Sequence, residues 1–242
     1  FVANHFAAKG VDMSVVVPKR PRIAQKDETL SQRVHSGITE VKIDSWEPLQ
    51  HSNKPIGENL GEKRGMLKRF MLWVRANFFI PDARVYWAKA VTHVFLEQHK
   101  QNPYDLIITS GPPHSLHLIG LQAKQQTGVL WIADFRDPWT GFFQNRSLPL
   151  NKKAKQKHKQ LEQKVLQHAD RTVVTAPSLK ADFKRHNSNV TLLTNGYEKP
   201  KSSATAPSGA MVYAGSLKAQ QNPTALWMAI ASLIKSNTTF SK

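Results

Sequence analysis

Residues 104–141 read YDLIITSGPPHSLHLIGLQAKQQTGVLWIADFRDPWTG, and this stretch decides the fold. The apolar run at 104–109 predicts a strand buried on both faces, and the run at 129–133 predicts a second strand. Between them, apolar side chains recur at helical spacing from His114 to Gly128, and the two prolines before His114 suit the first turn of a helix. Strand, helix and strand in this order predict a parallel pair with a helical crossover.

Polar residues follow both predicted strands. Residues 110–115 come after the first strand and residues 134–141 after the second. Because the carboxyl ends of parallel strands meet at one edge, where open α/β sheets bind ligands, we expect both loops to line one site. The predicted helix would aim its free N–H groups into the same space. Alternatively, Arg136 pairs with Asp134 or Asp137 and only holds the loop; the pattern alone leaves both interpretations open.

Alternation of strands and helices continues along the chain and predicts one parallel sheet with helices on both faces. Residues 19–65 are polar and irregular, with one short strand expected at 39–44. The other predicted elements are the tail of a helix at 1–9 closed by Gly10, strands at 13–18, 172–175 and 190–193, and helices at 83–99, 152–169 and 177–186. Trp87 and His117 are expected to be packing residues, and the lysine-rich start of the helix at 152–169 is expected to be a solvated face.

Residues 66–80, MLKRFMLWVRANFFI, form a basic and aromatic-rich helical segment. One interpretation is an interfacial helix that rests on an anionic membrane. The other is a helix packed into the core with its cations outside, and we favour this one because amphipathic helices are more often core-facing.

Composition narrows the function classes. The 242 residues contain no cysteine, which excludes disulfides and thiolate metal sites, and no apolar run is long enough to span a membrane. The formal net charge of +17 attracts polyanions such as nucleic acid, anionic lipid or phosphorylated substrates. A non-catalytic basic α/β module that binds nucleic acid or another polyanion is therefore the alternative function, although no nucleic-acid-binding motif is present.

Five segments together carry a resemblance to a known family: SGPPHSLHLIG at 110–120, WIADFRDPWTG at 131–141, LEQKVLQHADRTVV at 161–174, TNGYEKP at 194–200 and VYAGSLKAQQNP at 212–223. In this order they resemble bacterial family 4 (group 1) glycosyltransferases of the GT-B fold. The resemblance covers most of the chain from about Pro81 onward.

The resemblance implies two Rossmann-like α/β domains. An amino-terminal acceptor-binding domain would occupy residues 1–198, a linker rich in Ser, Pro and Ala would occupy 199–209, and a donor-binding domain would begin at 210–242 with a strand and a helix that starts at Asn222-Pro223. Comparison of the sequence with the family pattern leads us to expect that this chain is a fragment truncated at both ends and is inactive on its own.

Family members transfer a sugar, with retention and generally without a bound metal, from a nucleotide-diphosphate sugar to a glycan or lipid-linked acceptor. The resemblance implies such a transferase in cell-surface polysaccharide biosynthesis, cytoplasmic and peripheral on the inner membrane face, with an anionic membrane surface as a further partner. The nucleotide sugar is a co-substrate, so no cofactor, no metal and no specific nucleic acid are expected. No catalytic residue is assigned, because in this family the leaving phosphate is thought to deprotonate the incoming hydroxyl.

Site residues follow from the loops and the resemblance. Carboxylates accept from sugar hydroxyls, and arginine suits phosphate or carboxylate. The expected substrate-binding residues are His114, Asp134, Arg136, Asp137 and Asn195. The expected donor-phosphate residues, in a turn before a helix, are Gly215, Ser216 and Lys218. We expect one crevice to be shared by His114, Asp134, Arg136, Asp137 and Gly215.

Overall fold

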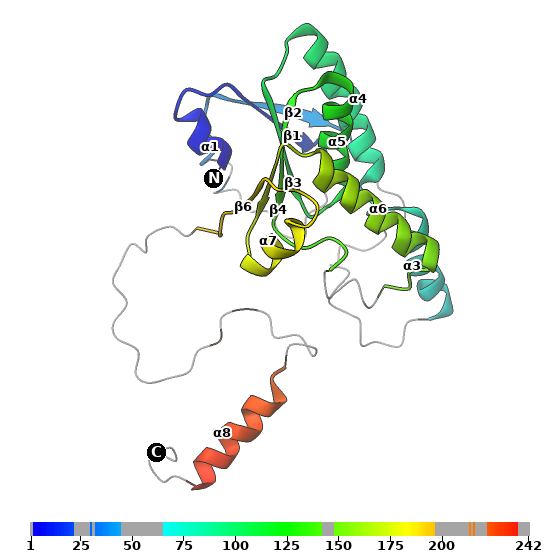
Figure 1. The fold of residues 1–242 in the computed structure, drawn as a ribbon, viewed down its shortest axis with the longest axis vertical. Helices are drawn as coiled ribbons and strands as arrows, with labels where there is room; N and C mark the ends of the chain where they lie inside the picture. Colours follow the sequence, from blue (N-terminus) through cyan, green and yellow to red (C-terminus); the bar gives the residue numbers. More distant parts are fainter. Residues whose placement is uncertain are drawn as a thin grey trace. The chain divides into compact units, whose positions relative to one another are not determined.

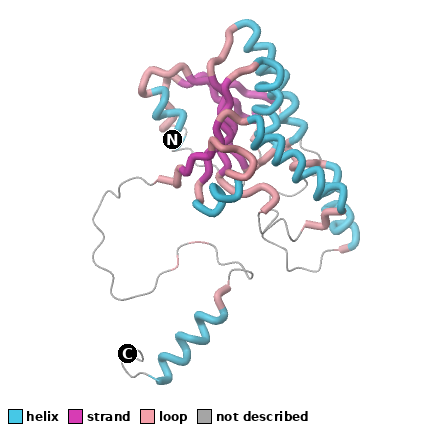
Figure 2. The backbone as a smooth tube through the Cα atoms, viewed as in Figure 1, coloured by secondary structure: helices cyan, strands magenta, loops and turns pink. Residues whose placement is uncertain are grey.

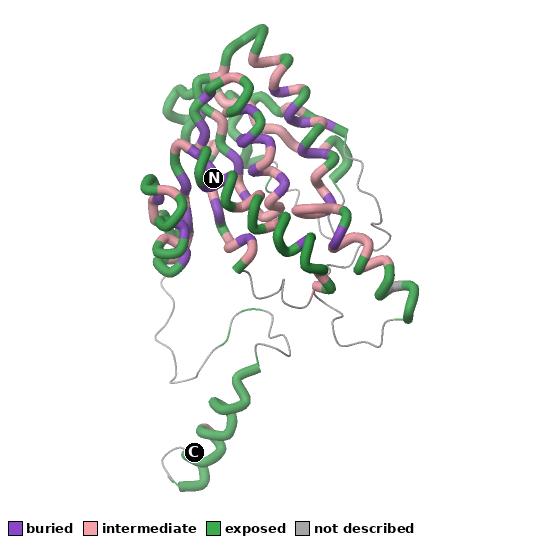
Figure 3. The backbone as a smooth tube through the Cα atoms, turned by 45° about the vertical axis from the view of Figure 1, so that its right-hand side comes forward, coloured by how far each residue is buried: buried purple, intermediate pink, exposed green. Residues whose placement is uncertain are grey.

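The computed structural model describes residues 2–21, 30, 32–44, 65–141, 148–196, 213, 215 and 222–236. The chain divides into two compact units, Phe1–Gly196 and Tyr197–Lys242. In the second unit, helix α8 (Thr224–Ser236) begins where Asn222-Pro223 predicted it, and it buries none of its residues (Figure 3). The predicted linker at 199–209 lies outside the described residues, as does the predicted strand at 211–214 apart from Tyr213.

A four-stranded parallel sheet forms the centre of the first unit, in the order β3-β4-β5-β6 (Figure 1). One helix connects each strand to the next, which confirms the predicted crossover and the Rossmann-like α/β class. The strands are β3 (Leu106–Gly111), β4 (Leu130–Phe135), β5 (Arg171–Val174) and β6 (Val190–Leu192), and the helices between them are α5 (Ser115–Thr127), α6 (Lys152–His168) and α7 (Pro177–Phe183).

Among the described residues, helices cover one face of this sheet. Because the strand order never reverses, right-handed crossovers carry all three connecting helices to the same face. On that face Trp131, Ala133 and Phe135 of β4 are fully buried. On the other face Leu106, Ile108 and Leu130 are 43%, 40% and 56% exposed. The prediction of a strand at 104–109 buried on both faces was therefore wrong, as was that of helices on both faces of this sheet.

A second, two-stranded parallel sheet is formed by β1 (Met13–Pro18) and β2 (Ile38–Ile43), so the single predicted sheet is divided in two. Helix α4 (Val85–Gln101) packs on it through Trp87, which is buried and donates from Nε1 to the carbonyl of Ile43 at 3.2 Å. The core cluster around Trp87 also contains Ile119 of α5, so these two helices join both sheets. Helix α1 (Val2–Ala7) lies across the strands from α4 and α5 (Figure 1). Trp87 is confirmed as a core residue.

Helix α3 (Met66–Phe78) contributes no side chain to the core clusters of the described residues, so the interpretation of a helix packed into the core was wrong. Its apolar side chains Met66, Leu67, Phe70 and Phe78 are exposed, whereas Met71, Leu72 and Val74 are half-buried and the polar Asn77 is buried. The Asn77 amide donates to the carbonyl of Pro149 at 2.9 Å and accepts from the N–H of Asn151 at 2.8 Å. The Asn77 side chain thus holds α3 beside the start of α6; the two helices lie side by side in Figure 2. In the described part of the chain, no helix is long and apolar enough to cross a membrane.

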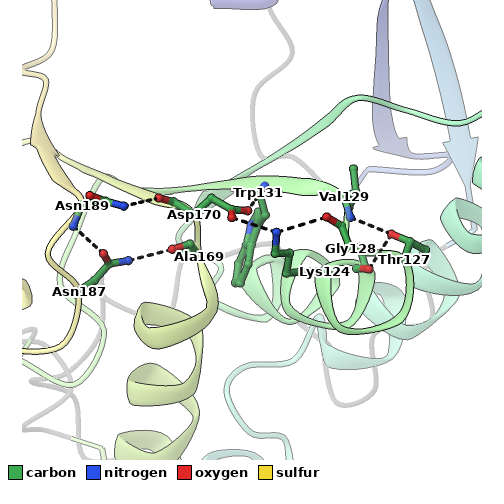
Figure 4. A network of polar contacts seen from close by, with 10 residues as sticks. Lys124, Thr127, Gly128, Val129, Trp131, Ala169, Asp170, Asn187 and Asn189 are labelled. Carbon is green, nitrogen blue, oxygen red and sulfur yellow. Dashed lines mark hydrogen bonds and ion pairs between the residues drawn. The ribbon is translucent and has the colours of Figure 1, made fainter.

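A polar network fastens the amino ends of β4 and β5 (Figure 4). Asp170 accepts from the backbone N–H of Trp131 at 2.8 Å and pairs with Lys124 of α5 at 2.9 Å. Burial opposes the charge of Asp170, yet these bonds hold its pKa below the ordinary value. Asn187 donates to the carbonyl of Ala169, and Asn189 donates to that of Asp170. The strands are therefore locked together at the edge opposite the predicted site.

Candidate functional site

The carboxyl ends of three neighbouring strands are joined by direct hydrogen bonds. Ser110 of β3 lies opposite Asp134 of β4 and donates from Oγ to its Oδ2 at 2.6 Å. One residue later, the N–H of Arg136 donates to the carbonyl of Gly111 at 3.0 Å. Beyond β5, the Thr175 hydroxyl donates to the carbonyl of Arg136 at 2.9 Å. The loops after β3 and β4 thus lie at one edge of the sheet, which confirms their predicted adjacency. We call this edge the rim and define it by Ser110, Asp134, Arg136 and Thr175.

Arg136 joins the two loops of the rim rather than pairing with an aspartate. Its Nη2 donates to the carbonyl of Pro112 at 2.6 Å, and the side chain is exposed. Among the ion pairs between described residues, none links Arg136 to Asp134 or Asp137, so the alternative that Arg136 only neutralises its neighbours was wrong. The guanidinium is held at one nitrogen and keeps other donors toward solvent.

The first N–H group of α5 is bonded to the side chain of Asp82, a contact that was not predicted from the sequence. The Asp82 carboxylate accepts from the Ser115 N–H at 2.9 Å and from its hydroxyl at 2.7 Å. The next two N–H groups donate to the carbonyls of Pro113 and His114. Both prolines therefore precede the helix, and the prediction that its first N–H groups are free for a ligand was wrong. The carboxylate at this positive helix end serves as its cap.

Replacing Asp82 with alanine is expected to destabilise the fold by about 2 kcal/mol, because two buried donors of Ser115 lose their acceptor. The Arg84 N–H, which donates to Asp82 at 2.9 Å, loses its acceptor as well. Urea unfolding followed by circular dichroism measures the change. Ser115→Ala removes only the hydroxyl bond and should cost less than half as much; equal costs for both variants would contradict the capping role.

His114, in the loop between β3 and α5, stacks flat on the indole of Trp139. The two ring centroids are 5.1 Å apart and the planes differ by 2°. Burial, with smaller effects of His158 and Arg136, lowers the pKa of His114 to about 4, so its imidazole is neutral near pH 7. Nδ1 is buried and has no partner among the described residues. His114 is thus placed to support the loop that carries Arg136, through Trp139.

Helix α6 fixes the loop after β4 from below. Its His158 accepts at Nδ1 from Trp139 Nε1 at 3.0 Å, and its Glu162 accepts from the N–H of Thr140 at 3.1 Å and also from the Thr140 hydroxyl. His158 and Glu162 were not among the site residues predicted from the sequence, because the surrounding lysines dominate the charge pattern of this segment. Their spacing of four residues on one helix face was the available signal.

The amino-acid sequence was also compared with known proteins. A family model described as a glycosyl transferase 4-like domain matches residues 2–196. The chain belongs to this family. It is therefore a glycosyltransferase domain of the family 4, GT-B type, and the resemblance drawn from the five segments is confirmed. None of the curated proteins compared with it gives a match.

A buried polar chain supports the rim of the glycosyltransferase domain from inside. Trp131 Nε1 donates to Thr109 Oγ1 at 2.9 Å, and Thr109 Oγ1 lies 3.0 Å from His117 Nδ1. The Thr109 hydroxyl has one proton and two lone pairs, so it can donate to Nδ1 or accept from it, and the direction of this bond depends on the His117 tautomer. The His117 ring is fully buried, stacks on Phe135 at 4.1 Å, and has its pKa lowered by burial. His117 is confirmed as a packing residue.

The remaining predicted site residues of the glycosyltransferase domain stay predictions. Asp137 is half-buried in the loop after β4, and Asn195 is exposed beyond the carboxyl end of β6. Gly215 has a φ of +143°, a conformation that favours glycine, but it belongs to the second unit, so its shared crevice with the rim is not tested. Ser216 and Lys218 lie outside the described residues. No cluster of three metal-ligating side chains occurs in the part of the chain that the structure describes.

Proposed function

We propose that this glycosyltransferase moves a sugar from a nucleotide-diphosphate sugar to a glycan or lipid-linked acceptor, with retention, in the synthesis of a cell-surface polysaccharide at the cytoplasmic face of a membrane. The observation that supports this proposal best is the rim, where hydrogen bonds from Ser110 to Asp134, from Arg136 to Gly111 and from Thr175 to Arg136 connect three adjacent strand ends. Such an edge of an open α/β sheet is the usual place for a ligand.

Two side chains of the rim have unused capacity for a substrate. Asp134 uses Oδ2 to accept from Ser110, which leaves Oδ1 to accept from a sugar hydroxyl. Arg136 uses one nitrogen on Pro112, which leaves N–H groups for a phosphate or carboxylate. His114 takes no proton in this proposal, because its neutral ring is committed to stacking on Trp139.

The proposed reaction exchanges one bond at the anomeric carbon of the donor sugar. The bond to the diphosphate oxygen breaks, a bond to the acceptor oxygen forms, and the acceptor proton passes to the leaving phosphate. Donors that face the developing negative charge lower the barrier. We assign this task to Arg136 and, on the donor side, to the turn at Gly215, Ser216 and Lys218. Asp137 and Asn195 are assigned to the acceptor, and the transfer uses no metal.

Transfer by the full-length protein from a panel of nucleotide-diphosphate sugars tests this proposal. Asp134→Asn and Arg136→Gln are each expected to lower kcat/KM by about 10- to 100-fold, because each removes a charged hydrogen bond to substrate. Asp105→Asn is the matched control, since Asp105 is exposed at the amino end of β3, away from the rim. The anomeric configuration of the product, by NMR, tests retention, and EDTA tests the need for metal. Full activity in both rim variants would overturn the site assignment.

A further inference from the structure

Helix α6 carries two polar side chains on the side that faces the core. Its buried residues Ala154, Val165 and Leu166 mark this side of the helix. His158 and Glu162 lie on the same side, four residues apart, and are half-buried. A polar group in such a position costs free energy unless it is hydrogen-bonded, so an apolar residue would stabilise the helix better there. Both side chains are bonded to the loop after β4, which points to a task in holding this loop.

The Glu162 carboxylate binds the far end of the loop. It accepts from the N–H of Thr140 at 3.1 Å and from the Thr140 hydroxyl. Among the ion pairs between described residues, none includes Glu162, so the two donors of Thr140 stabilise its charge in place of a cation. Hydrogen bonds to a charged group are stronger than those between neutral groups, so Thr140 is held firmly.

His158 holds the residue before Thr140. Its Nδ1 accepts from Trp139 Nε1 at 3.0 Å, which requires a ring without a proton on that nitrogen. Burial lowers the pKa of His158, against the opposing effect of Asp82, and so favours this neutral ring. Trp139 is fully buried and stacks on His114 of the preceding loop. The loop after β4 is therefore attached both to α6 and to the loop after β3.

Arg136 belongs to the same loop, between the end of β4 and the contacts with α6. Its N–H donates to the carbonyl of Gly111, and its carbonyl accepts from the Thr175 hydroxyl. Its guanidinium is exposed and donates to the carbonyl of Pro112. No hydrogen bond between described residues joins this guanidinium to α6. The two α6 side chains thus act on Arg136 through the loop backbone rather than by touching it.

We propose that Glu162, together with His158, is a positioning residue for sugar transfer, because it holds the loop in which the Arg136 guanidinium meets the leaving phosphate of the donor. This inference rests on the proposed function, which assigns that phosphate to Arg136. Misplacement of a reacting group by about 1 Å costs about 100-fold in rate. Negative charge develops on the phosphate during transfer, so misplacement of Arg136 should lower kcat more than it raises KM.

Steady-state transfer by the full-length protein tests this inference. Glu162→Ala should lower kcat by about 10- to 100-fold and change the KM for the donor by less than about threefold. Glu162→Gln keeps an acceptor for Thr140 and should recover most of this loss. His158→Phe keeps a ring but removes the acceptor of Trp139 Nε1, and should lower kcat by about 3- to 10-fold. Gln163→Ala is the matched control, a truncation at the exposed neighbouring position of α6.

A double-mutant cycle separates positioning from a loss of stability. Since Glu162 acts through Arg136, Glu162→Ala should lower kcat by less than about twofold once Arg136→Gln is present. Equal losses in both backgrounds would overturn the proposal, as would full activity in Glu162→Ala or no recovery in Glu162→Gln. The urea midpoint of each variant shows that it is folded in the assay. Thr140→Val removes one of the two bonds from the loop side and gives the same cycle should Glu162→Ala not fold.

A readout without substrate distinguishes failure of this inference from failure of the proposed function. In NMR spectra of isotope-labelled protein, the indole N–H signal of Trp139, assigned by its loss in Trp139→Phe, reports the state of the loop. Its exchange with solvent should be about tenfold faster in Glu162→Ala and unchanged in Gln163→Ala. Unchanged exchange in Glu162→Ala would overturn the positioning role, even in a protein that transfers sugar. Faster exchange in a protein that transfers no sugar would confirm the hold on the loop and overturn the proposed function instead.

Discussion

Gly120→Ala is expected to destabilise the first unit by about 3 kcal/mol or more. A Cβ atom at Gly120 would lie 2.0 Å from Nε1 and 2.2 Å from Cε2 of Trp131. The Trp131 ring is fully buried, and its Nε1 is bonded to Thr109, so it cannot move without breaking that bond and opening the core. Alanine gains about 1 kcal/mol in helix propensity over glycine, which is too little to offset the clash.

The measurement is the urea midpoint of unfolding at constant m-value, which reports stability alone. Gly141→Ala is the matched control, because its Cβ would make only an ordinary contact with Pro138 at 3.7 Å. Gly120→Ala combined with Trp131→Phe should recover part of the loss, since the smaller ring vacates the place of Nε1 and Cε2. A Gly120→Ala variant as stable as the control would show that Trp131 does not pack against α5 as described.

Acidification is expected to destabilise the fold strongly between about pH 6.5 and about pH 4. Burial lowers the pKa of His114 to about 4, and it also lowers the pKa values of His117 and His158. The unfolded chain therefore binds protons at these histidines that the folded chain does not bind. The free energy of unfolding is accordingly highest above the pKa of the unfolded histidines and decreases as the pH falls. For His114 alone the loss approaches about 3 kcal/mol.

Unfolding midpoints in urea at a series of pH values measure this dependence. His114→Phe keeps a ring against Trp139 but cannot take up a proton. This variant should reduce the slope of the unfolding free energy against pH by the contribution of His114. His186→Gln is the control for the loss of a histidine at an exposed position, since His186 follows α7 and is exposed. A slope that His114→Phe does not alter would mean that the His114 ring is more accessible to water than its stacking on Trp139 indicates.

The strand–helix–strand centre could be predicted because its signals are local. The helix predicted to close at Gly128 ends there with Gly128 in the left-handed conformation, at φ +74°. The strand predicted at 13–18 has those bounds, and the turn before it has Gly10 at φ +82°. Adjacency of the loops after the two strands followed from their parallel pairing, which the structure confirms. Hydrophobic periodicity and the glycine and proline residues at the ends of elements are local signals, and they were sufficient to predict each of these features.

The parts that could not be predicted depend on contacts between distant segments. Asp82 caps a helix that begins 33 residues later, and no local pattern encodes such a bond. The direction in which α3 faces was ambiguous for another reason. An amphipathic period is the same whether the apolar stripe meets the core or the solvent, so Phe70 and Phe78 could not be assigned from spacing.

The network of Asp170 with Lys124 and the Trp131 backbone has a consequence for how this protein can change. It fastens β4 and β5 at their amino ends, whereas Asp134, Arg136 and Thr175 stand at the far ends of the same strands. Under the function proposed above, alignment of the strands and recognition of a substrate depend on separate sets of side chains. Substitutions at the rim would then alter substrate specificity while the Asp170 network keeps the strands in register.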